Sequence, residues 1–140
     1  MTTKPTRGAV VGYDGSERSL AAVRWALEHV GPDDPITLVA ALGHEASPLP
    51  GGLVHLWPGE IVRSAEAIAR AWARDGDALE SEVELVIQRG APADLLARVA
   101  EERDAEVIVV GKERRWLGLL RASVARDLLK RARRAVVVVR

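Results

Sequence analysis

The sequence predicts one α/β domain over residues 1–140, with a doubly wound five-stranded parallel sheet and helices on both faces. The chain has 140 residues, a common size for one domain, and 48% of them are apolar, enough for one continuous core. Apolar runs typical of strands alternate with segments of helical periodicity, four times over, before a last strand. The runs are rich in Val and Ile without polar alternation, which indicates strands covered on both faces of a parallel sheet.

The first strand is predicted at 9–13, a short apolar run that ends in the turn sequence Asp14-Gly15-Ser16. Ser16 can cap the helix that follows, while Asp14 and Glu17 have the spacing of a capping box. Gly31-Pro32 is expected to end this helix. Its apolar face is made by residues three and four positions apart: Leu20, Val23, Leu27 and Val30.

The remaining elements follow the same alternation. A second strand is predicted at 36–42, and a long loop at 43–59, which holds three prolines and four glycines. The second helix has its apolar face on Ile61, Ala65, Ile68 and Trp72. Strands at 83–87 and 107–110 flank a third helix, which begins after Gly90-Ala91-Pro92 and faces the core with Leu95, Leu96 and Val99. A fourth helix carries Val124, Leu128 and Leu129, and a last strand is predicted at 135–139.

The charge of the chain is divided unevenly, although the formal net charge is zero. Residues 111–140 carry ten basic and two acidic residues, a charge of +8, so residues 1–110 carry −8. This asymmetry indicates an anion site or a surface for an acidic protein partner near the C-terminal end of the fold. A solvated basic helix face is the alternative. We expect no nucleic acid partner, because the basic residues are not interleaved with stacking aromatics beyond Trp116.

Several classes of protein are excluded by what the sequence lacks. Without cysteine it has no disulfide, thiolate nucleophile or cysteine-based zinc site. Its three histidines match no metal motif, so we expect no metal. No segment approaches 18 apolar residues, and the polar N-terminus at 1–8 does not resemble a signal peptide. We therefore expect a cytoplasmic protein without a membrane span. No nucleophile–base–acid arrangement, Walker loop or carboxylate cluster indicates catalysis.

Ligands of an open parallel sheet bind beyond the carboxyl ends of its strands, where the strand order reverses. Here those ends carry Asp14 and Gly15 after the first strand, Ala41 near the end of the second, and Gly111 with Lys112 after the fourth. Each has a structural alternative: Asp14 can be a helix cap and Gly111 can simply end a strand.

The chain resembles the universal stress protein domain over essentially its whole length. The resemblance rests on Val-Gly-Tyr-Asp-Gly-Ser-Glu-Arg-Ser at 11–19, Gly90-Ala91-Pro92, and 107–111 followed by Ala122-Ser123-Val124 and the valine-rich last strand. It implies a parallel sheet of order 3-2-1-4-5, frequent dimerisation through the last strand, and ATP or another adenine nucleotide as the ligand of some members. It also implies a non-catalytic regulatory role in the stress response.

The resemblance implies a particular site. Asp14 would approach adenine, backbone near Ala41 would line the base pocket, and a loop of pattern glycine, two residues, glycine, nine residues, glycine, serine or threonine would hold ribose and phosphates. This sequence departs from that loop, because Arg114 and Ala122 stand at the second and third glycine positions with seven residues between them. The candidate ligand-binding residues are Asp14, Gly15, Ala41, Gly111, Lys112, Arg114, Ala122, Ser123 and Val124.

The altered loop leaves two alternatives open. Its cations, Lys112, Arg114, Arg115 and Arg121, can take over phosphate contacts from backbone amides, which favours a phosphorylated ligand of another size, such as a monophosphate or a cyclic dinucleotide. Alternatively, an arginine fills the pocket by pairing with Asp14. In that case the protein is a ligand-free, dimeric interaction module.

The last strand predicts a homodimer through 135–139. Four consecutive valines at a sheet edge form a surface prone to pair with another strand, and Arg133, Arg134 and Arg140 only partly protect it. Pairing with a second copy would cover this edge.

Overall fold

The computed structural model describes residues 7–42, 58–79, 83–112 and 124–140. Strands and helices alternate within these ranges. The strands are β1 (Ala9–Gly12), β2 (Ile36–Leu42), β3 (Val83–Arg89), β4 (Val107–Gly111) and β5 (Ala135–Val139), and the helices are α1 (Glu17–His29), α2 (Pro58–Leu79), α3 (Pro92–Glu102) and α4 (Val124–Arg131).

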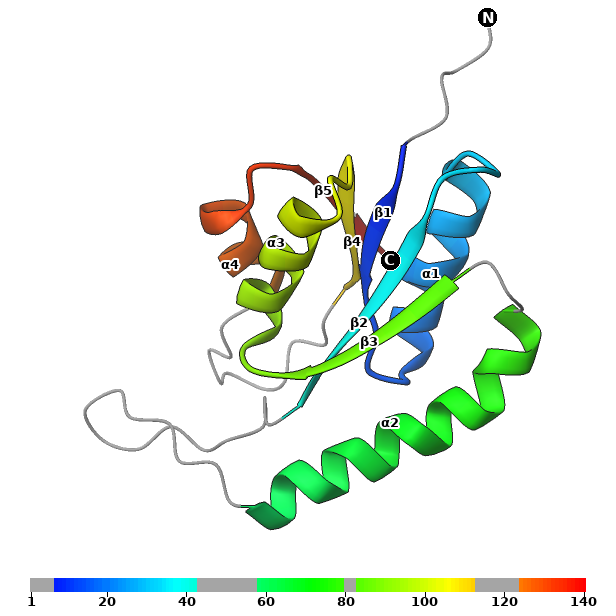
Figure 1. The fold of residues 1–140 in the computed structure, drawn as a ribbon, viewed down its shortest axis with the longest axis vertical. Coiled ribbons are helices and arrows are strands. Elements are labelled where there is room, and N and C mark those ends of the chain that lie inside the picture. Colours follow the sequence, from blue (N-terminus) through cyan, green and yellow to red (C-terminus); the bar gives the residue numbers. More distant parts are fainter. Residues whose placement is uncertain (1–6, 43–57, 80–82, 113–123) are drawn as a thin grey trace, which may run out of the picture.

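The five strands form one parallel sheet in the order β3-β2-β1-β4-β5 (Figure 1). The first strand is central, with Ala9 paired to Ile36 of β2 on one side and to Val107 of β4 on the other. Strand order therefore reverses at β1, between β2 and β4. The predicted fold class and strand order are confirmed.

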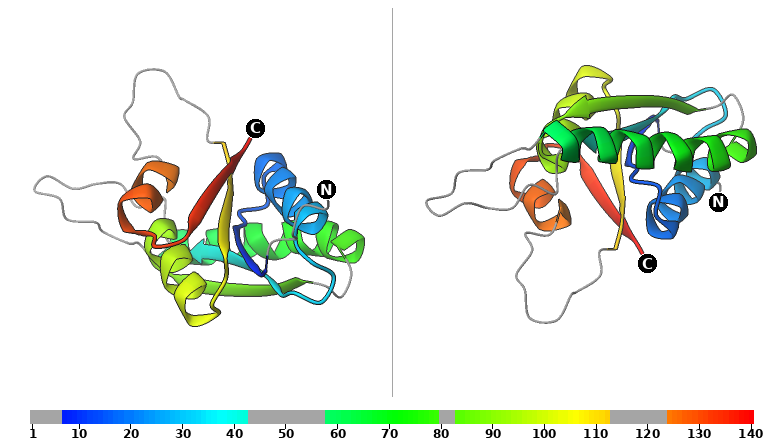
Figure 2. Two further views of the ribbon diagram at one scale, coloured as in Figure 1. Left: turned by 90° about the horizontal axis from the view of Figure 1, so that it is seen from above. Right: turned by 90° about the horizontal axis from the view of Figure 1, so that it is seen from below.

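Helices cover both faces of the sheet. Val11 of β1 packs into a cluster with α1 and α2, while its neighbour Val10 packs into a second cluster with α3 and α4, and both valines are fully buried. Seen from above, α3 and α4 lie on the opposite side of β4 and β5 from α1 (Figure 2). Because successive side chains of a strand point to opposite faces, a central strand of this kind must be apolar at every position.

Element boundaries differ from the sequence-based expectation in several places. Helix α2 begins at Pro58, so residues 58–59, expected at the end of the long loop, belong to a helix; proline at a first helical position loses no hydrogen bond. Residues 43–57 lie outside the described ranges. Strand β1 ends one residue earlier than expected, whereas β3 continues to Arg89.

The two neighbouring leucines of α4 differ in burial. Leu129 is 71% exposed, whereas Leu128 is fully buried against α3 and the sheet. Consecutive residues of a helix point about 100° apart, so the side of α4 that buries Val124 and Leu128 leaves Leu129 outside. The sequence pattern identified an apolar pair but not which member faces the sheet.

Candidate functional site

The carboxyl ends of β1 and β4 lie next to each other. The two strands are paired in register from Ala9 and Val107 to Val11 and Val109, so the turn that contains Asp14 follows β1 beside the end of β4 at Gly111 (Figure 1). The contact with α1 is close, since a Cβ atom on Gly111 would lie 2.4 Å from the carbonyl oxygen of Arg18. Glycine at 111 therefore permits α1 to approach the end of β4.

Side-chain and backbone hydrogen bonds fix the turn after β1. The carboxylate Oδ1 of Asp14 accepts the amide of Ser16 at 2.9 Å. The hydroxyl of Ser16 accepts the amide of Ser19 at 3.2 Å, which makes Ser16 the N-cap of α1. The capping-box interpretation of Asp14 and Glu17 is therefore wrong, because Asp14 lies two residues before the cap. Asp14 is exposed, and no described residue donates to its second oxygen, Oδ2.

Helix α2 supports this turn from behind. Gly15 has a φ of +83°, a conformation that side chains disfavour, and a Cβ atom there would lie 2.4 Å from the Cβ of Ala71. Arg74 donates from Nη2 to the carbonyl oxygen of Gly15 at 2.9 Å. Both the backbone conformation and the packing at position 15 thus require glycine.

A buried polar pair continues the contact between β1 and α2. The hydroxyl of Tyr13 donates to Oδ2 of Asp75 at 2.8 Å, and the ring of Tyr13 meets Trp72 edge to face at 5.8 Å. Arg74 donates to both oxygens of Asp75, at 2.9 Å to Oδ1 and 3.0 Å to Oδ2. Asp75 is therefore satisfied on both oxygens although it is buried.

The ionisation of this pair is fixed by its surroundings. Hydrogen bonds from Arg74 and Tyr13 hold the pKa of Asp75 below its usual value, against the effect of burial. Burial and the Asp75 carboxylate raise the pKa of Tyr13, so its hydroxyl stays protonated and able to donate. Sequence reasoning missed Arg74 and Asp75. The signal was Asp75, a carboxylate three residues after Trp72 on the apolar face of α2, but nothing in the sequence connected it to Tyr13.

The end of β4 is tied to both of its neighbours. The amide of Lys112 donates to the carbonyl oxygen of Val139 in β5 at 2.8 Å. On the other side, Nη1 of Arg18 donates to the carbonyl oxygen of Lys112 at 2.8 Å. The Lys112 side chain is exposed, with no ion pair to a described residue. The first residue after β4 is thus held in place while its charge remains open to a ligand.

The other predicted site residues divide into two groups. Ala41 lies near the end of β2, partly buried against the α3 side of the sheet, and Val124 begins α4. Arg114, Ala122 and Ser123 lie outside the described residues. The structure therefore brings together Asp14, Gly15, Gly111 and Lys112, with Ala41 on the adjacent strand.

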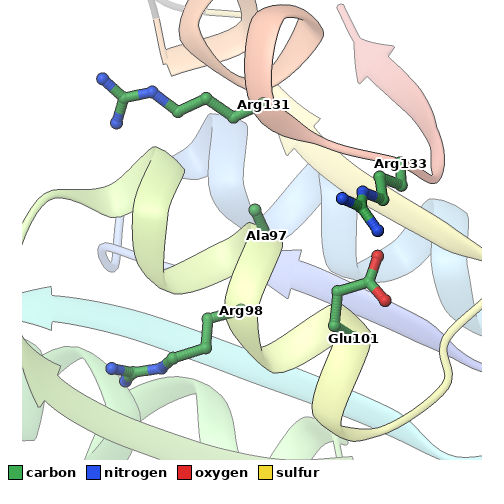
Figure 3. A pocket seen from close by; sticks show the side chains of 5 residues that line it. All are labelled: Ala97, Arg98, Glu101, Arg131 and Arg133. Atoms are coloured by element: carbon green, nitrogen blue, oxygen red, sulfur yellow. The ribbon is translucent and has the colours of Figure 1, made fainter.

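A cavity of about 260 Å³ lies elsewhere, between α3 and the end of α4, with Ala97 between four longer side chains: Arg98, Glu101, Arg131 and Arg133 (Figure 3). Carboxylates compensate two of its three arginines, since Arg131 pairs with Asp94 and Arg98 with Glu102 at 3.5 Å. Its one carboxylate, Glu101, pairs with Arg134 at 3.1 Å. The Arg131–Asp94 pair joins α4 to α3, and we assign this cavity no ligand.

A second cavity, of about 520 Å³, lies at the opposite end of the sheet, around the connection from α1 to β2 (Val30 to Ile36).

Among the described residues there is no cluster of His, Asp and Glu side chains suited to a metal ion. In the same ranges, no helix combines the length and apolarity that crossing a membrane requires. The carboxyl edge of β1 and β4 remains the candidate site.

Comparison with known proteins identifies the family. The universal stress protein family model matches residues 6–140. A solved protein of this family from Burkholderia pseudomallei is 27% identical, with 96% of each chain covered and a TM-score of 0.62. A universal stress protein in complex with cAMP is 24% identical, covering 97% of this chain and 98% of its own, with a TM-score of 0.63.

A third solved structure, the universal stress protein from Archaeoglobus fulgidus in complex with dAMP, is 24% identical; 96% of this chain and 98% of that chain are covered, with a TM-score of 0.62. No curated protein is detectably similar in sequence. Because the family model covers nearly every residue and the fold agrees, the chain belongs to the universal stress protein family.

Proposed function

We propose that this protein binds an adenine nucleotide, or another phosphorylated ligand, at the carboxyl ends of β1 and β4. In this proposal it acts without catalysis, as a cytoplasmic regulatory protein of the stress response. Family membership supports the proposal, as do the two relatives that were solved with cAMP and dAMP. The polar and charged side chains at this edge of the sheet support it as well.

The observation that carries the proposal is the exposed Asp14 carboxylate beside the end of β4. Oδ1 of Asp14 is used to order the turn, whereas Oδ2 is open to accept a hydrogen bond from a base amino group or a ribose hydroxyl. Across the same edge, Lys112 offers an exposed cation to a phosphate. A ligand with a hydrogen-bond donor at one end and an anion at the other fits this pattern.

The direct test is calorimetric titration of the nucleotide-stripped protein with ATP, AMP and cAMP. We expect micromolar binding of at least one of these nucleotides. Asp14→Asn keeps an oxygen for the Ser16 amide but removes the charge, and it should weaken binding about tenfold, the effect of one charge-assisted hydrogen bond. Asp33→Asn is the matched control, since Asp33 is an exposed aspartate at the opposite end of the sheet.

A flat response to every nucleotide would contradict the proposal and favour the second candidate, an interaction module without a ligand. One observation favours that candidate. Several exposed cations form no ion pair with any described residue, so they are open to an acidic protein surface: Lys112, Lys130, Arg133 and Arg140.

We also propose that two copies associate through β5. This strand lies at the edge of the sheet, bonded to β4 on one side only, and its Val138 is 45% exposed. An apolar edge strand with unpaired backbone groups is stabilised by pairing with the same strand of a second copy.

A further inference from the structure

Two arginines flank the turn after β1, and they differ in how their charge is compensated. Arg74 donates to both oxygens of Asp75, so its charge is matched by a buried carboxylate. Among the described residues, the Arg18 side chain forms one hydrogen bond, to the carbonyl oxygen of Lys112, and no ion pair. Of these two arginines, the one on α1 therefore carries the uncompensated charge.

Arg18 is held in place at two points. Its backbone lies against the end of β4, where a Cβ on Gly111 would come within 2.6 Å of its carbonyl carbon. Its side chain reaches the next residue, with Nη1 2.8 Å from the carbonyl oxygen of Lys112. A guanidinium group has five N–H donors, so this single bond orients the group and leaves four donors for a ligand.

The neighbouring charges indicate how a ligand would be oriented at this edge of the sheet. The side chain of Lys112 is a second exposed cation, and it belongs to the residue whose carbonyl oxygen Arg18 contacts. Asp14 lies on the turn before α1 and repels an anion, but it attracts hydrogen-bond donors. A bound ligand would therefore place its sugar or base toward Asp14 and its anionic group toward Arg18 and Lys112.

We propose that Arg18 recognises the phosphate of the ligand and determines specificity for phosphorylated over unphosphorylated compounds. This inference rests on the proposed function. The planar guanidinium can bind two phosphate oxygens at once, which a lysine cannot do. In this way a side chain on α1 performs a task that the resemblance assigned to backbone amides of a glycine loop, which this sequence lacks.

The test compares AMP with adenosine, which differ only in the phosphate. The wild-type protein should bind AMP more tightly. Arg18→Gln should weaken AMP binding about tenfold, the effect of losing a charge-assisted hydrogen bond, and change adenosine binding less than about twofold. The AMP affinity of Arg18→Lys should lie between those of the wild-type protein and Arg18→Gln. Arg24→Gln, at an exposed arginine on the same helix, should change neither affinity.

The outcomes separate this inference from the proposed function. If wild-type protein binds both compounds and Arg18→Gln weakens both equally, Arg18 only stabilises the turn and the inference is wrong, while nucleotide binding stands. If Arg18→Gln leaves AMP binding unchanged, the inference is also wrong.

Titration with inorganic pyrophosphate, followed by the amide NMR signals of Gly111 and Lys112, tests the anion site without a nucleoside. Shifts that Arg18→Gln abolishes support the inference even if adenosine does not bind, and their absence from wild-type protein contradicts it.

Discussion

The hydroxyl of Tyr13 donates a hydrogen bond of 2.8 Å to Oδ2 of Asp75, and the two residues are only 2% and 6% exposed. This bond joins the end of the central strand to α2, 62 residues later in the chain. Seen from below, α2 crosses in front of the sheet (Figure 2). The turn that carries Asp14 is therefore supported by a helix that does not neighbour it in sequence.

Removing the tyrosine hydroxyl should destabilise the protein. In Tyr13→Phe the buried carboxylate of Asp75 loses one of its donors, and hydrogen bonds to charged groups contribute about 2 kcal/mol. Urea unfolding followed by circular dichroism would measure the loss. Asp75→Ala combined with Tyr13→Phe should cost less than the sum of the two single changes. Additive costs would show that the two side chains do not interact.

The same carboxylate predicts a pH dependence of stability. Because the pKa of Asp75 is lowered in the folded protein from its usual 3.8, its contribution is complete well above pH 3.8 and is lost as the pH falls through the folded pKa. The difference in unfolding free energy between wild type and Asp75→Asn should therefore be larger at pH 7 than at pH 3. Thermal unfolding at both pH values checks this, and an equal difference would contradict it.

Substitution of Gly15 by alanine should destabilise the turn by about 1–3 kcal/mol, because its positive φ disfavours a side chain and Ala71 occupies the space. Gly12→Ala is the matched control. A Cβ at position 12 would lie 3.4 Å from the flexible side chains of Leu96 and Val110, with no positive φ. Chemical denaturation should show a clearly larger loss for Gly15→Ala, and equal losses would argue against the strained turn.

The proposed dimer can be tested at the edge strand with little damage to the core. Val137 packs against the α1 side of the sheet, so a charge there would also disturb folding. Val138 is 45% exposed, and Val138→Lys should produce monomers in light scattering coupled to size exclusion. Ile87→Lys is the control, since Ile87 is 44% exposed on β3 at the opposite edge. A dimer unchanged by Val138→Lys would place association on another surface.

The sequence predicted the alternation of strands and helices because apolar periodicity and turn residues are local signals. It also predicted which residues lie at the carboxyl edge, since all strands of a parallel sheet end there. The Ser16 cap could be predicted from its position before the first helix, whereas the exposure of Leu129 beside the buried Leu128 could not. Which side of a short helix faces the sheet depends on the neighbouring helix, and helical spacing alone allows both choices.

By itself, the sequence determined the class of fold, the family resemblance and the candidate residues Asp14 and Gly111, through patterns that each span a few residues. Only the tertiary structure decided what surrounds them: the Tyr13–Asp75 bond, the requirement for glycine at position 15, and the reach of Arg18 to Lys112. These contacts join residues 56 to 94 positions apart. Their energies depend on distance and burial, which a linear pattern does not contain.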